Sequence, residues 1–158
     1  MTDRLPPKPI RASRISLAQT MGPEHANNYG NVHGGWIMKL VDEAGGVACM
    51  RHAQRRVVTV AIDSMVFRHP VKTSDLVLLN AEVTYTGKTS IEAEVQVVAE
   101  NPITGERWHT NTAYLLYVAL DEDGKPTEIP PVFGETVEEE KKLEEAKKRQ
   151  TRRLEQRT

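Results

Sequence analysis

The sequence predicts an α+β fold in which an antiparallel sheet covers one long helix. Three observations support this prediction: one helical pattern lies in the first third of the chain, several strand-like segments follow it, and short turns join those segments. Consecutive strands joined by short turns pair in antiparallel fashion, and one amphipathic helix can bury its apolar face against the resulting sheet. A chain of 158 residues is long enough for one such domain with a single core.

The opening segment and the long helix differ in the spacing of their apolar residues. Residues 11–21 show the alternation of a short strand, and residues 22–35 form a loop rich in Gly, Asn and His. From Gly34 or Gly35 to about His52, apolar residues recur at steps of three and four. This spacing predicts a helix with one buried face.

Two consecutive glycines interrupt the predicted helix. Gly45 and Gly46 each cost about 1 kcal/mol relative to alanine in a helix interior, so we expect another group to approach the helix closely there. Cys49 follows among apolar neighbours. It is predicted to be a buried structural thiol rather than a nucleophile.

Further strands are predicted after the helix, over residues 57–68, 76–86, 90–100 and 107–120. In the strand over residues 90–100, polar side chains at Glu92, Glu94 and Gln96 separate the apolar ones. Because side chains of a strand alternate between its two faces, this strand is predicted to have one buried face and one face in water.

The end of the chain is far more charged than the rest. From residue 135 to residue 158, 15 of 24 positions are charged, and three Glu residues precede a Lys or Arg by four positions. Such pairs support a helix by about 0.2 to 0.5 kcal/mol each. We expect a solvated C-terminal helix, and the alternative is that this helix binds a partner.

Composition limits the class of protein. The chain carries 21 Lys and Arg against 22 Asp and Glu, so it lacks the basic surface of a nucleic-acid-binding protein. The longest purely apolar run, from Ala113 to Leu120, has eight residues, whereas a membrane span needs roughly 18. With a single cysteine, an internal disulfide and a cysteine-rich zinc site are excluded. We expect a cytoplasmic protein with no nucleic-acid or membrane partner.

Common catalytic motifs are absent from the sequence. No serine lies in G-x-S-x-G, no histidine pair has the H-E-x-x-H spacing of a metal site, and no glycine run forms a phosphate-binding loop. The remaining candidates lie between residues 26 and 46. Gly34 and Gly35 at the start of a helix would let backbone N–H groups polarise a substrate carbonyl, and the alternative is that they only allow a tight turn.

Asp42 in the same helix could act as a general base or as a nucleophile. The alternative is that it forms an ion pair with Lys39 or Arg51. Gly34 and Asp42 are eight residues apart, which is about 12 Å along a helix, and both groups would need to lie about 3 Å from one reacting centre. If both act, two antiparallel copies of the helix must lie side by side, and the paired glycines suit such close packing.

Several linked segments resemble one family, the hotdog-fold acyl-CoA thioesterases, and in particular the YciA-like and brain acyl-CoA hydrolase group. The resemblance covers roughly residues 14–132. The segments that carry it are Asn27 to Gly35, Met38 to Gly45, Val60 to Val71, Thr86 to Ser90 and Tyr117 to Asp121. It implies that residues 14–132 form a hotdog domain between an N-terminal extension at 1–13 and a charged C-terminal helix at 133–158.

The resemblance also implies an activity and an assembly. It implies hydrolysis of acyl-CoA to a free carboxylic acid and coenzyme A, without a metal or redox cofactor, in a homodimer whose sheets join and which often forms a trimer of dimers. Its catalytic pair, contributed across the dimer, falls on Asn27 and Asp42. Asn28 is the weaker match to the asparagine position.

Residues that could bind the phosphates of coenzyme A are Arg68, His69, Lys88, Thr89 and Ser90. Each could instead be an ordinary solvated group at a turn or strand end. Two other functions remain open: an acyl-CoA-binding sensor of the same fold without turnover, and a dehydratase with His33 as the catalytic residue. We expect His33 to shape the start of the helix instead.

Overall fold

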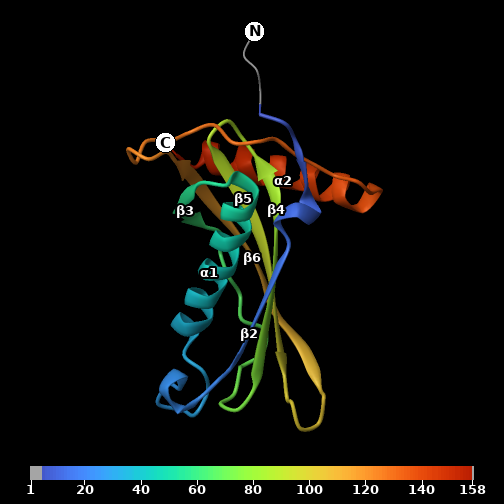
Figure 1. The fold of residues 1–158 in the computed structure, drawn as a ribbon. Coiled ribbons are helices and arrows are strands. Elements are labelled where there is room, and N and C mark those ends of the chain that lie inside the picture. Colours follow the sequence, from blue (N-terminus) through green and yellow to red (C-terminus); the bar gives the residue numbers. More distant parts are fainter. Residues whose placement is uncertain (1–4, 158) are drawn as a thin grey trace.

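The computed structural model describes residues 5–157 (Figure 1). Residues 1–4 of the predicted N-terminal extension, and Thr158 at the end of the predicted C-terminal helix, lie outside the described residues. The helices and strands are β1 (Lys8–Pro9), η1 (Ile10–Ser13), β2 (Ile15–Thr20), η2 (Pro23–His25), α1 (Gly34–Ala53), β3 (Arg56–Ile62), β4 (Leu76–Thr86), β5 (Ser90–Glu100), β6 (Arg107–Leu120), β7 (Val132–Phe133) and α2 (Val137–Glu155).

Five strands form one antiparallel sheet in the order β2-β4-β5-β6-β3, and the short strands β1 and β7 pair in parallel beside it. The sheet is twisted and lies against α1 on one side (Figure 1). This arrangement confirms the predicted α+β hotdog fold. The bounds of α1 match the predicted helix, and β4, β5 and β6 have the predicted bounds.

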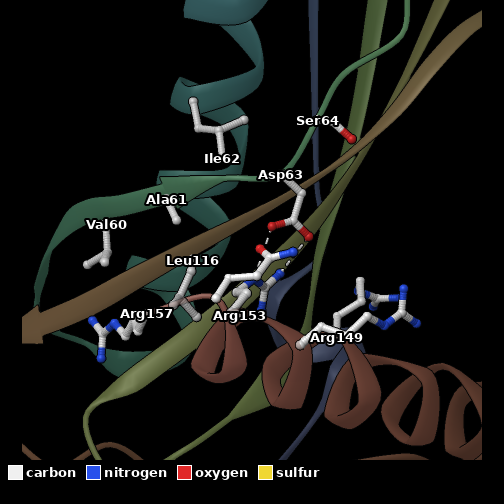
Figure 2. Close-up of a pocket in the computed structure, with 11 residues that line it drawn as sticks. Val60, Ala61, Ile62, Asp63, Ser64, Leu116, Arg149, Arg153 and Arg157 are labelled. Carbon is white, nitrogen blue, oxygen red and sulfur yellow. Dashed lines mark hydrogen bonds and ion pairs between the residues drawn. The ribbon is translucent and has the colours of Figure 1, made fainter.

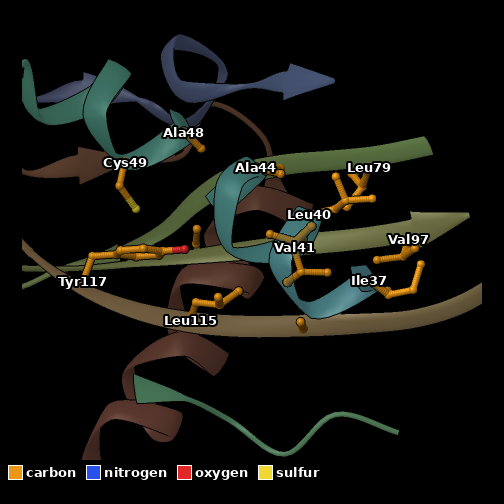
Figure 3. Close-up of a cluster of buried hydrophobic side chains, with 14 of the residues drawn as sticks. Ile37, Leu40, Val41, Ala44, Ala48, Cys49, Leu79, Val97, Leu115 and Tyr117 are labelled. Atoms are coloured by element: carbon orange, nitrogen blue, oxygen red, sulfur yellow. The ribbon is translucent and has the colours of Figure 1, made fainter. Parts of the chain in front are cut away.

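The core lies between α1 and the inner face of the sheet. Helix residues spaced three or four positions apart face the sheet, and strand residues spaced two positions apart face the helix. Figure 3 shows side chains of α1 and of the sheet that meet in this core. Those labelled on α1 are Ile37, Leu40, Val41, Ala44, Ala48 and Cys49, and they meet Leu79, Val97, Leu115 and Tyr117. Cys49 is buried, and burial, followed by the nearby charge of Glu92, raises the pKa of its thiol. Its prediction as a structural thiol is confirmed.

Two predicted strands extend beyond the observed ones. The opening strand starts at Ile15 rather than residue 11, because residues 10–13 form a 3-10 turn. The Ser13 hydroxyl closes this turn by donating to the Ile10 carbonyl at 2.7 Å. Strand β3 ends at Ile62 rather than residue 68, and the chain beyond it leaves the sheet.

The predicted water-facing side of β5 is wrong, because α2 packs against it. Glu92 is fully buried and Glu94 is 7% exposed. Arg149 of α2 donates to Glu92 at 2.8 Å, and Arg153 of α2 donates to the same carboxylate. The C-terminal helix is therefore docked on the outer face of the sheet, opposite α1, instead of being solvated.

A second ion cluster holds the middle of α2. Glu82 and Glu94 face each other in the register of β4 and β5, an arrangement that like charges disfavour. The Lys142 ammonium lies between them, 2.7 Å from Glu82 and 3.3 Å from Glu94. Burial by itself raises the pKa of Glu82, but hydrogen bonds from Lys142 and Arg14 outweigh burial and lower that pKa below its ordinary value.

None of the helices within residues 5–157 is long and apolar enough to cross a membrane.

The docking of α2 predicts that Arg149→Ala destabilises the protein. Arg149 makes two hydrogen bonds to the buried Glu92, and its guanidinium lies 3.6 Å from the centre of the Tyr114 ring. Arg153 still pairs with Glu92 in this variant, so the expected cost is that of lost hydrogen bonds to a charged group, about 1.5 to 3 kcal/mol. Urea denaturation should show this loss, whereas Arg152→Ala on the exposed side of the same helix should change the free energy of unfolding by less than about 0.5 kcal/mol. Equal stability of the two variants would show that the pair does not hold α2.

Candidate active site

Asp42 lies near the middle of α1 and is partly buried. Its Oδ1 atom accepts two hydrogen bonds, from the Thr59 hydroxyl at 2.8 Å and from the Tyr117 hydroxyl at 2.9 Å. Its Oδ2 atom accepts no hydrogen bond from the described residues. One carboxylate oxygen is therefore fixed by hydroxyl donors, and the other is left for a water molecule or a substrate.

The ion pairs considered as the alternative for Asp42 do not form. Lys39 pairs with Glu43 one helical turn further on, at 3.3 Å. The Arg51 guanidinium donates to the Arg14 carbonyl at 2.9 Å. The side-chain partners of the Asp42 carboxylate in residues 5–157 are thus hydroxyl groups and not cations.

Tyr117 and Thr59 were not predicted as site residues. Burial, and then the charge of Asp42, raise the pKa of Tyr117 far above its ordinary value, so its hydroxyl remains a donor at physiological pH. The close approach predicted at Gly45 is confirmed, but it comes from Tyr117 of the same chain rather than from a second helix. A glycine in a helix interior was the one signal in the sequence that pointed towards this tyrosine.

Asn27 shapes the loop before α1. Its Oδ1 atom accepts hydrogen bonds from the backbone N–H groups of Tyr29 at 2.8 Å and Asn31 at 3.2 Å. The amide Nδ2 group is left as a donor that makes no hydrogen bond within residues 5–157. Asn28 makes no side-chain hydrogen bond within the same part of the chain, so the loop orients the side chain of Asn27 and not that of Asn28.

Gly34 and Gly35, in the first turn of α1, differ in whether their backbone N–H groups are already hydrogen-bonded. The Gly35 N–H donates to the His33 Nδ1 atom at 3.0 Å, so His33 caps the helix as predicted. The Gly34 N–H makes no hydrogen bond within the described residues, and this leaves Gly34 the freer backbone donor of the two. The Phe67 ring lies 3.8 Å from the position that a Cβ atom on Gly34 would take.

The five residues predicted to bind coenzyme A fall into two groups at opposite ends of β6. The Arg68 N–H donates to the Thr110 carbonyl at 3.1 Å, whereas the Thr89 carbonyl accepts from the Ala119 N–H at 3.0 Å. Nine residues of a strand separate these two contacts, which is about 30 Å. Arg68 and the exposed His69 follow Phe67, at the Gly34 end of α1.

Lys88, Thr89 and Ser90 form the turn at the other end of the sheet. The Lys88 carbonyl accepts from the Ile129 N–H at 3.2 Å, and the neighbouring Pro130 carbonyl lies 2.7 Å from His52 at the end of α1. A single chain therefore keeps Gly34 and Arg68 at one end, Asp42 in the middle and Lys88 at the other end.

Strand β3 is an outer strand of the sheet and carries apolar side chains into solvent. Val58, Val60 and Ile62 are 45%, 43% and 37% exposed. Within residues 5–157, β6 is the only strand that pairs with β3. The unpaired backbone groups of an exposed apolar edge of this kind can form hydrogen bonds with another strand. Because Thr59 belongs to β3, Asp42 lies next to this open edge.

A cleft of about 600 Å³ lies between the end of β3 and the arginines of α2, where Arg153 binds Asp63 (Figure 2). None of the predicted site residues lines it. In residues 5–157, no group of three His, Cys, Asp or Glu side chains is arranged to hold a metal ion.

Comparison with known sequences identifies one family. Residues 29–106 match the family described as "Thioesterase superfamily". The acyl-CoA thioester hydrolase YciA of Salmonella typhimurium is 38% identical over 112 residues, which are 68% of this chain and 84% of that protein. The chain spans only 38% of the length of the mammalian cytosolic acyl coenzyme A thioester hydrolases that it matches.

Solved structures show the same fold. A hexameric acyl-CoA thioesterase in its apo form superposes with a TM-score of 0.91 at 36% identity, covering 96% of this chain and 97% of the other. The acyl-CoA hydrolase of Staphylococcus aureus, solved with butyryl coenzyme A, superposes with a TM-score of 0.89 at 32% identity, covering 96% and 93%. Variants of that hydrolase with alanine in place of an aspartate, an asparagine or a threonine have also been solved.

Proposed function

This chain belongs to the thioesterase superfamily, and from that premise we propose that it hydrolyses acyl-CoA to a free carboxylic acid and coenzyme A. The observation that carries the proposal is the carboxylate of Asp42, which is held by Thr59 and Tyr117 with one oxygen free. The three residue types replaced in the Staphylococcus aureus hydrolase are those of Asp42, Asn27 and Thr59. The activity in the names of the relatives supports the same conclusion.

The proposed site is shared between two copies of the chain. Gly34 and Asp42 of one chain lie about 12 Å apart along α1, too far to act on one carbonyl. The open edge of β3 pairs with β3 of a second copy, which continues the sheet and sets the two α1 helices side by side in opposite directions. Asp42 of one copy then faces Asn27 and Gly34 of the other.

The proposed reaction uses groups of both copies. The Asn27 Nδ2 group and the Gly34 N–H donate to the thioester carbonyl oxygen, which becomes negative as the carbon is attacked. Asp42 of the second copy takes a proton from the attacking water, or its free oxygen attacks the carbon and forms an anhydride that water then hydrolyses. The carbon–sulfur bond breaks, and coenzyme A leaves as a thiolate that is then protonated. No cofactor is needed beyond the coenzyme A of the substrate.

An antiparallel pair also accounts for the separation of the residues assigned to coenzyme A. It brings the end of one chain that carries Lys88, Thr89 and Ser90 towards the end of the other that carries Arg68 and His69. These cations and hydroxyl groups would together bind the phosphates. We further propose that three such homodimers assemble into a trimer of dimers in the cytoplasm, in keeping with the hexameric neighbour.

Thiol release from short, medium and long acyl-CoAs tests the activity. We expect wild-type protein to release thiol from at least one of them, and Asp42→Asn to lower kcat by about 10²- to 10⁴-fold, because it removes the proton acceptor and keeps the size of the side chain. Lys141→Ala on α2 is the matched control and should keep wild-type rates. Binding of acyl-CoA without thiol release would identify a sensor instead.

Mixing two inactive variants tests the sharing of the site. Asp42→Ala and Asn27→Ala each disable both sites of their own homodimer. In an exchanged dimer both defects fall on one site and the other is intact, so complete exchange should restore about one quarter of wild-type activity. No recovery after exchange has been verified by mass spectrometry would contradict a shared site.

Lys88→Ala tests the binding of the coenzyme A phosphates. Loss of a charge-assisted hydrogen bond should raise KM about tenfold with little change in kcat. Steady-state kinetics with CoA and dephospho-CoA thioesters would show whether Lys88 meets the 3′-phosphate, because the effect would then disappear with the dephospho substrate. Unchanged KM for both substrates would remove Lys88 from the site.

A further inference from the structure

We propose that Tyr117 is a positioning residue that fixes the catalytic carboxylate of Asp42, and that position 45 is a glycine to make room for the Tyr117 hydroxyl. This inference rests on the proposed function, because it assigns to Tyr117 and Gly45 the task of orienting a group that reacts. The sequence did not predict Tyr117 or Gly45 as part of the site.

Tyr117 reaches Asp42 from the strand that faces the middle of α1. Its side chain is 1% exposed, and Figure 3 shows its ring extending from β6 towards the helix, with the hydroxyl at the helix side. The hydroxyl oxygen lies 2.9 Å from Oδ1 of Asp42 and 3.0 Å from its backbone carbonyl. The Tyr117 hydroxyl proton thus has two acceptors, both on Asp42. The hydroxyl therefore holds the Asp42 carboxylate in a fixed position relative to the backbone of α1.

Gly45 leaves the space that this hydroxyl occupies. A Cβ atom at position 45 would lie 2.6 Å from the Tyr117 hydroxyl oxygen and 3.4 Å from two ring carbons. The first distance is far inside van der Waals contact, so any side chain would displace the hydroxyl. At Gly46 a Cβ atom would lie 3.8 Å from the nearest ring atom, an ordinary contact. Only the first of the two glycines is therefore required by Tyr117.

The two hydroxyl donors favour the reactive orientation of the Asp42 carboxylate. Thr59 and Tyr117 both bind Oδ1, which fixes the rotation of the carboxylate and leaves Oδ2 directed to the remaining space. Asp42 and Cys49 are the titratable groups that act on the Tyr117 hydroxyl, while Lys39 and Glu43 on the exposed side of α1 pair with each other. Without Tyr117, the Asp42 carboxylate should rotate more freely.

Tyr117→Phe and Gly45→Ala test the inference, with Gly46→Ala as the matched control and Asp42→Asn as the reference for a lost carboxylate. Tyr117→Phe removes one oxygen atom and keeps the ring in the core, so the fold is retained. We expect about a tenfold fall in kcat with KM nearly unchanged, because the carboxylate is no longer held in the reactive orientation. Gly45→Ala should reproduce this fall in kcat, and Gly46→Ala should keep the wild-type values.

The double variant Gly45→Ala/Tyr117→Phe separates positioning from a general loss of stability. With the hydroxyl gone, the added methyl group no longer displaces it, so the second substitution should lower kcat by much less than it does alone. If Asp42→Asn is inactive while Tyr117→Phe keeps the wild-type kcat, the inference is wrong and the proposed function stands. If Asp42→Asn keeps the wild-type kcat, the inference and the proposed catalytic role of Asp42 are both wrong, whereas the absence of thiol release by the wild-type protein would overturn the proposed function.

Discussion

The structure depends most on how the sheet presents two hydroxyl groups to one carboxylate on the helix. Thr59 comes from β3 and Tyr117 from β6, and these strands are neighbours in the sheet although 58 residues separate the two positions. The pairing of Thr59 with Tyr117 is a direct one in the strand register. Because the hydroxyls converge on Oδ1 of Asp42, the register of two strands fixes the orientation of a group on α1. A slip of β3 by one residue against β6 would turn the Thr59 hydroxyl to the opposite face, away from Tyr117 and Asp42.

The two faces of the sheet use different chemistry to hold their helices. On the inner face, α1 is held by apolar contacts, with Asp42 at the open edge beside β3. On the outer face, α2 is held by ion pairs whose acidic partners lie on β4 and β5 and whose basic partners lie on the helix. The outer pairs extend to Asp63 directly after β3, so α2 also anchors the segment that leads to Phe67 and Arg68.

Most of the fold follows from local patterns in the sequence. The cover on the outer face of β5 and the partners of Asp42 could not be predicted, because they depend on contacts between residues far apart in the chain. Steps of two and of three or four residues located three strands and α1, because burial of one face imposes those periods. Alternation in β5 could not show that α2 covers Glu92, since acidic residues alternate in the same way whether water or arginine faces them. Linked motifs pointed to Asn27, Gly34 and Asp42, but Thr59 and Tyr117 meet Asp42 only through strand pairing. Gly45 gave a local sign of that contact without naming the partner.

A crystal structure of the assembled protein with a non-hydrolysable ketone analogue of acyl-CoA would test the shared site most directly. The analogue should be the ketone in which a methylene group replaces the thioester sulfur and the carbonyl is kept. We expect the β3 strands of two copies to pair, with the analogue's carbonyl between them. The Asn27 amide of one copy and the free Asp42 oxygen of the other should each lie within about 3.5 Å of the carbonyl group. A carbonyl contacted by groups of one chain alone, or an Asp42 that faces bulk solvent in the assembly, would contradict it.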